Sequence, residues 1–114
     1  PLLADGGMTT GKVGEDLGLE EASKAAYQVG LNILATVRES LGSLNRVERV
    51  IKLLGMVNAV PEYTQHPQVI NGCSELFRDI WGEDCGVGTR SAFGVSGLPA
   101  GACVEIEGIL LLRK

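Results

Sequence analysis

The sequence predicts an α+β fold in which two helices cover one face of a small β-sheet. Two long segments repeat apolar residues at intervals of three and four, the spacing of an amphipathic helix. Three other segments are rich in β-branched and apolar residues and are bounded by turn formers, as strands are. With 114 residues, the chain is expected to form a single domain over 1–114, in the order helix, strand, helix, strand, strand.

The first helix is predicted to begin at Leu19, after a glycine-rich loop over 1–18 that contains at most a short strand. Its inward stripe consists of Ala22, Ala26, Val29, Ile33, Val37 and Leu41. Glu20 and Glu21 suit the first turn because the helix dipole favours negative charge there. Gly42 is a natural stop.

A long strand is predicted over 45–60, because β-branched residues are frequent in it and Pro61 closes it. One face of this strand is expected to carry Val47, Ile51, Leu53, Val57 and Ala59, and much of the other Val50, Leu54, Met56 and Val60. Residues 67–82 return to helical spacing, and Pro67 suits a first turn while Gly82 suits an end.

The last part of the chain predicts a short strand over 91–95, a turn over 97–101 and a final strand over 102–112. One face of the final strand consists of Ala102, Val104, Ile106, Leu110 and Leu112, and the other of Cys103, Glu105, Glu107, Ile109 and Leu111. Two helices can cover only one face of the sheet, and soluble proteins rarely expose a large apolar patch. The back face, including Ile109 and Leu111, is therefore expected to be an oligomer interface.

Composition limits the partners and the compartment. A net charge of −4 without a run of Lys or Arg argues against nucleic acid, and no segment has the ~20 apolar residues of a membrane span. Cys73, Cys85 and Cys103 are odd in number and widely spaced, which does not indicate a disulfide framework. We expect a reducing compartment, the cytoplasm. The sequence starts at Pro1 without Met, so the natural N-terminus is expected to be missing or processed. If a targeting segment was removed, an organelle is the alternative to the cytoplasm.

Arg90 is a single cation in a largely apolar segment. It is either a surface or ion-paired residue or a planar clamp for a carboxylate. Glu105 and Glu107 share one side of the final strand. They form either a solvated edge, the partners of a cation such as Arg49, or a carboxylate that positions water.

Other polar residues are interpreted more simply. Asn71 is by default a capping or surface residue, and His66 an exposed loop histidine. The single histidine and the widely spaced cysteines do not have the spacing of zinc ligands. The sequence also shows no phosphate-binding loop and no nucleophile elbow.

The segment "RSAFGVSGLPAGACVEIEGI", residues 90–109, resembles the C-terminal signature of the Rid family of reactive-intermediate deaminases. This family is also called YjgF or L-PSP endoribonuclease. Upstream, "VINGCSELF" (69–77) is similar to the family's second helix, and the resemblance covers about residues 10–113. The segment "VGEDLGLEEASKAA" (13–26), which leads into the first helix, is typical of a divergent branch of the family.

The resemblance implies a chorismate-mutase-like fold, a mixed sheet with two helices on one face, assembled as a homotrimer with clefts between subunits. The family's N-terminal hairpin would precede Pro1 and is expected to be absent. Ala92 stands where well-studied deaminases often carry Cys.

The activity that the resemblance implies is hydrolysis of an enamine or imine, such as 2-aminoacrylate, to a 2-keto acid and ammonia. This is deamination of the 2-iminobutanoate/2-iminopropanoate type. Arg90 would bind the carboxylate, Glu105 would orient water and Asn71 would line the cleft, with no metal or organic cofactor. The alternatives are a non-catalytic trimer that binds small carboxylates or partner proteins and, third, an endoribonuclease.

Overall fold

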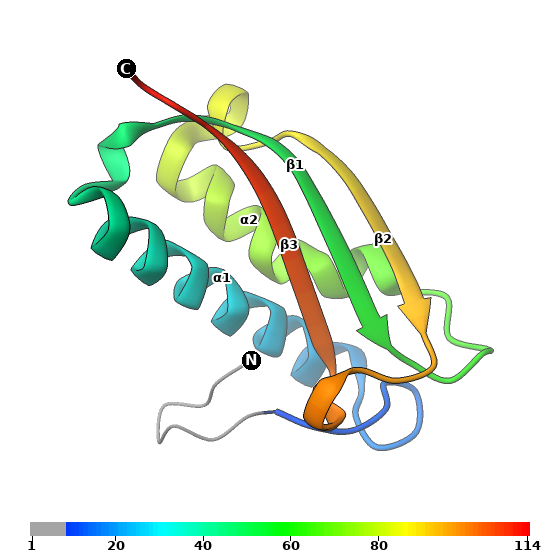
Figure 1. Ribbon diagram of the computed structural model, residues 1–114. Helices are drawn as coiled ribbons and strands as arrows, with labels where there is room; N and C mark the ends of the chain where they lie inside the picture. The colour runs from blue at the N-terminus through cyan, green and yellow to red at the C-terminus, as the bar shows by residue number, and fades with distance from the viewer. Residues whose placement is uncertain (1–8) are drawn as a thin grey trace.

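The computed structural model describes residues 9–114, which form two long helices and a three-stranded sheet (Figure 1). The elements are α1 (Leu19–Leu41), η1 (Leu44–Arg46), β1 (Val47–Asn58), α2 (His66–Cys85), β2 (Thr89–Val95), η2 (Pro99–Gly101) and β3 (Val104–Leu112). The predicted order of helices and strands is confirmed. Residues 9–18 form the predicted loop, with isolated β-bridges to neighbouring segments. Between residues 9 and 114, no helix is long and apolar enough to cross a bilayer.

The two ends of α1 agree with the prediction. Glu20 and Glu21 occupy its first turn, and Gly42 follows its last residue with a φ of 84°. The Gly42 N–H donates to the carbonyl of Arg38 (2.8 Å), so this left-handed residue closes the helix.

The sheet has the strand order β2-β1-β3, with β1 parallel to β2 and antiparallel to β3. Because β1 and β2 run parallel, α2 is the crossover that connects them. Both helices lie on the same side of the sheet (Figure 1). Gly55 of β1 points to that side, since a Cβ built on it would lie 2.5 Å from the side chain of Ile70 in α2. The predicted layering is confirmed, and we call this side the covered face and the other the open face.

The first half of β1 departs from the predicted alternation. The register with β3 shifts between Val47 and Arg49 and again between Val50 and Lys52. Such irregularities change which side chains face the core. Val50 is consequently buried at 2% exposure, whereas Ile51 is 40% exposed. The prediction that Ile51 shares a face with Leu53 and Val57 was wrong, because it assumed an unbroken alternation.

The second helix is longer than predicted. It begins at His66 and continues to Cys85, but helical geometry breaks at Gly82, the predicted end, where φ is 90° and the segment kinks. His66 is half-buried, and its ring contacts Tyr63 edge-on at a centroid distance of 5.5 Å. The interpretation of His66 as an exposed loop histidine was therefore wrong.

The core lies between the covered face and the helices. Its largest fully buried side chains include Phe77, Ile70, Val13, Val47, Val50, Val57 and Val69. Within residues 9–114 nothing covers the open face, where Phe93, Ile109 and Leu111 are 40%, 59% and 43% exposed. Residues 9–114 thus leave this partly apolar face to solvent, as the sequence predicted, and the partner that covers it stays a prediction.

Candidate functional site

Arg90 is the second residue of the edge strand β2. The parallel register places it opposite Leu53, which shares a side of β1 with Gly55, so Arg90 belongs to the covered face. Its Nη1 atom donates to Asn71 Oδ1 (2.6 Å) and to Ser74 Oγ (3.1 Å), both on α2. Two residues of the predicted site, Arg90 and Asn71, are therefore in direct contact.

A cavity of about 370 Å³ opens beside Arg90, between α2 and the start of β2. It is lined by Leu53, Asn71, Ser74, Glu75, Arg78, Gly86, Val87, Gly88 and Arg90. Ser74, Glu75 and Arg78 were not singled out from the sequence. They follow Asn71 by three, four and seven positions, which places them on one face of a helix. The periodicity that located the core could also have located these residues.

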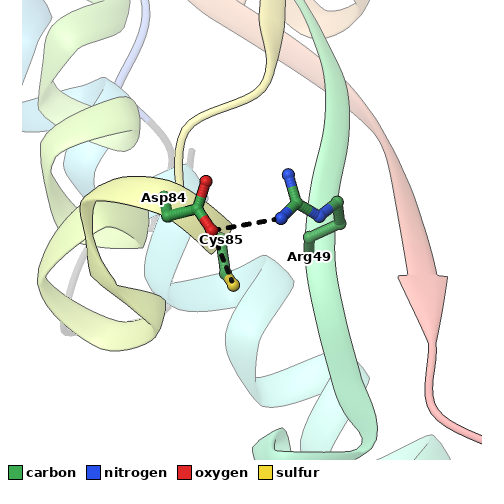
Figure 2. A network of polar contacts seen from close by, with 3 residues as sticks. All are labelled: Arg49, Asp84 and Cys85. Atoms are coloured by element: carbon green, nitrogen blue, oxygen red, sulfur yellow. Dashed lines mark hydrogen bonds and ion pairs between the residues drawn. The ribbon is translucent and has the colours of Figure 1, made fainter.

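Arg90 has no carboxylate partner among the residues that the structure describes. Arg49, which the sequence offered as a partner for Glu105 and Glu107, pairs with Asp84 near the end of α2 (Nη2 to Oδ2, 3.3 Å; Figure 2). It is therefore not the ion-pair partner of the carboxylates of β3. Neutral acceptors hold one nitrogen of the Arg90 guanidinium, which has five N–H donors in all. Its positive charge and its remaining donors are available to an anion in the cavity.

Glu105 lies on the open face, away from Arg90. It pairs with Met56 of β1, whereas Arg90 pairs with Leu53. Residues three apart on a strand point to opposite faces, and β1 separates the two outer strands. Glu105 is half-buried, and neither it nor Glu107 has an ion pair within residues 9–114. One chain therefore does not bring the predicted water-orienting carboxylate to Arg90.

The thiols do not contribute chemistry to this cavity. All three cysteines are free, and Cys73 and Cys103 are fully buried. Burial raises the pKa of the Cys73 thiol to about 12, so the thiol is protonated near neutral pH and is a core group. In the described part of the chain, no group of three His, Cys, Asp or Glu side chains could hold a metal ion. The chemistry of the cavity depends on Arg90 and the polar side chains beside it.

Known proteins resemble this chain over most of its length. Residues 1–105 match the model of a family described as "YjgF/chorismate_mutase-like, putative endoribonuclease". Protein TCP17 of Trypanosoma cruzi is 39% identical over 109 residues, which cover 96% of this chain and 68% of TCP17.

Solved structures extend the similarity to three dimensions. The protein Atu1372 of Agrobacterium tumefaciens, described as having unknown function, gives a TM-score of 0.93 at 40% identity over 98% of this chain and 72% of its own. A "putative endoribonuclease" of Shewanella oneidensis gives a TM-score of 0.84 at 25% identity, over 91% of this chain and 68% of its own. In both cases the matched part is most, but not all, of the relative.

Proposed function

Because the chain belongs to the YjgF/chorismate mutase-like family, we propose that it is a hydrolytic deaminase of reactive imines and enamines. The family match confirms the resemblance noted in the sequence, and the structural neighbours confirm the chorismate-mutase-like fold. The observation that carries the proposal is the state of Arg90. It is a cation at the wall of a cavity, positioned by neutral acceptors and without a carboxylate partner in residues 9–114.

The proposed substrate is a 2-imino carboxylate or its enamine tautomer, such as 2-aminoacrylate. Arg90 binds the carboxylate through two N–H groups, while Asn71 and Ser74 fix the plane of the guanidinium. Water adds to the C=N carbon, the resulting carbinolamine releases ammonia, and a 2-keto acid remains. Such imines hydrolyse readily in water, so holding the substrate and the water in place can supply much of the rate. Water and the imine supply every atom of the products, so we propose no cofactor.

The assembly that we propose is a homotrimer, the state that the family resemblance implies. Arg90 and Glu105 face opposite sides of one sheet, so a site that uses both needs a second copy of the chain. Exposed Phe93, Ile109 and Leu111 on the open face supply an apolar surface for that contact. Glu105 of one copy would then orient the water opposite the carboxylate held by Arg90 of the next.

The test measures the disappearance of 2-iminobutanoate, generated in the assay and trapped by semicarbazide when it is not hydrolysed. The wild-type protein should lower the trapped fraction and accelerate release of 2-ketobutyrate. Arg90→Ala should fall to the uncatalysed rate, and Lys24→Ala, which changes an exposed cation of α1, should match the wild type. A wild-type rate no higher than that of Arg90→Ala would overturn the proposal.

A second candidate, a non-catalytic binder of small carboxylates, is favoured by the separation of Glu105 from Arg90. Calorimetry would support it if 2-ketobutyrate binds the wild type and not Arg90→Ala, while no imine is turned over. Endoribonuclease activity, the description that the family and the Shewanella protein carry, ranks third. The net charge of −4 opposes it. Ribonuclease activity that persists through purification and is lost in Arg90→Ala would reverse this order.

A further inference from the structure

A second cavity, of about 510 Å³, lies at the opposite end of the parallel strands from Arg90. It is lined by Lys12, Ala59, Val60, Pro61, His66, Gly94, Val95 and Ser96. Lys12 comes from the loop before α1, and the other residues follow the carboxyl end of β1, lie at or just after the carboxyl end of β2, or begin α2. The positive end of a helix dipole and the carboxyl ends of parallel strands favour anionic ligands at such a place.

Lys12 supplies a fixed positive charge to this cavity. Its Nζ donates to Asn58 Oδ1 (2.9 Å) and to the carbonyl of Ser96. Asn58 is only 5% exposed, and its Nδ2 donates to the carbonyl of Ala102 (3.3 Å), which orients its oxygen toward Lys12. An ammonium has three donors, so one remains. Within residues 9–114 no carboxylate lines the cavity or forms an ion pair with Lys12 Nζ, and the Asp16 carboxylate accepts from the Lys12 backbone N–H instead (2.9 Å).

His66 forms a second polar wall. Its ring is fixed from one side by the edge-on contact with Tyr63. On another side, Nε2 lies so close to β2 that a Cβ on Gly94 would approach it to 2.6 Å. Gly94 thus leaves room for the ring to lie over the end of the strand, where His66 lines the cavity.

We propose that this cavity binds a short-chain monocarboxylate, independently of the Arg90 site and of the deaminase reaction. The carboxylate accepts from the free donor of Lys12 and from His66. The side chains of Ala59, Val60, Pro61 and Val95 form an apolar wall for the carbon chain. A single full cation matches a single negative charge, which favours a monocarboxylate over a phosphate dianion.

The experiment titrates the whole protein with butyrate and follows backbone amide shifts by NMR, with inorganic phosphate and 1-butanol as comparison probes. Butyrate should cause saturable shifts at Gly94, Val95 and Ser96, and phosphate and butanol should bind at least about tenfold more weakly. Lys12→Met, which keeps the aliphatic stem, should weaken butyrate binding by about tenfold or more. Arg90→Met should leave the shifts at this end of β2 unchanged.

His66→Phe provides an independent variant, because it keeps a ring against Tyr63 while removing both ring nitrogens. It should weaken butyrate binding severalfold even if Lys12→Met does not fold. The proposal is overturned if butyrate causes no saturable shift at residues 94–96. It is equally overturned if phosphate binds there as tightly as butyrate, or if the folded variants bind like the wild type.

Discussion

The two faces of the sheet both carry apolar side chains, although the open face also carries Glu105 and Glu107, and residues 9–114 cover only one of the two faces. The central residues of the covered face, which include Leu53, Val57 and Val104, are almost inaccessible. On the open face, Phe93, Ile109 and Leu111 remain at least 40% exposed. The difference indicates that α1 and α2 complete the core of a single chain, whereas we propose that a second copy of the chain covers the open face.

The predicted site is divided between these two faces. Arg90 belongs to the covered face, where α2 supplies the Asn71 and Ser74 oxygens that position it. Glu105 belongs to the open face and has no ion-pair partner within residues 9–114. The arginine can therefore be positioned within one chain, while the proposed role of the glutamate depends on assembly.

Truncation of the core beneath the covered face should have the largest effect on stability. Phe77 is fully buried and packs against Trp81 at a centroid distance of 5.4 Å. Phe77→Ala should lower the free energy of unfolding by about 3–5 kcal/mol, measured by chemical denaturation. The matched truncation Phe93→Ala, on the open face, should cost clearly less at low protein concentration. Equal costs for the two variants would remove the distinction between the faces.

A charge on the open face should abolish assembly. Leu111→Glu places a carboxylate on the apolar surface near Glu107, and it removes a side chain whose burial contributes roughly 1.5–3 kcal/mol per copy. Analytical ultracentrifugation should show a trimer for the wild type and a monomer of 12.0 kDa or aggregate for the variant. Ile80→Glu is the matched control, because Ile80 is 44% exposed but lies on α2, away from the open face. A monomeric wild type would contradict the interface.

Mixed assemblies should reveal whether one site combines Arg90 and Glu105 from different copies. Arg90→Ala and Glu105→Gln should each be inactive alone. If the chains are unfolded together and reassembled in equal amounts, a ring with one site per interface regains both residues at roughly a quarter of its sites. Imine hydrolysis should then return to about a quarter of the wild-type rate. No recovery, although the reassembled trimers are intact, would place both residues of a site in one chain or exclude the role of Glu105.

Periodicity and turn residues were sufficient to predict both helices, the order of helices and strands along the chain, and the uncovered sheet face. They failed where the structure depends on pairing between distant segments. The shifts in register that bury Val50 and expose Ile51 arise between β1 and β3 and leave no mark in the alternation of β1 alone. His66 is half-buried because it packs against Tyr63 and against Gly94 of β2, and Gly94 is distant from it in the sequence.

The candidate site shows the same limit. The resemblance gave Arg90, Asn71 and Glu105 as a set, and the contact between Arg90 and Asn71 is present. The assignment of Glu105 to the other face follows from the period of two along β3 only once the strand order is known. The contact between Lys12 and Asn58 joins residues 46 positions apart, and no local pattern marks it.

The smallest effect should come from the thiols beneath the covered face. Burial raises the pKa of Cys73 from 9.0 to about 12, and it also raises the pKa of Cys103. Above pH 9 the unfolded chain therefore loses thiol protons that the folded chain keeps. The contribution of these thiols to the free energy of unfolding is complete below pH 9 and should fall as the pH rises toward 12, by at most about 1.4 kcal/mol per pH unit for each thiol.

At fixed protein concentration, chemical denaturation between pH 8 and 11 should show a shallower decline of the free energy of unfolding for Cys73→Ala than for the wild type. Cys85→Ala, which removes a thiol at the surface end of α2, is the control and should keep the wild-type slope. Identical slopes for all three proteins would mean that the covered face does not seal Cys73 from solvent.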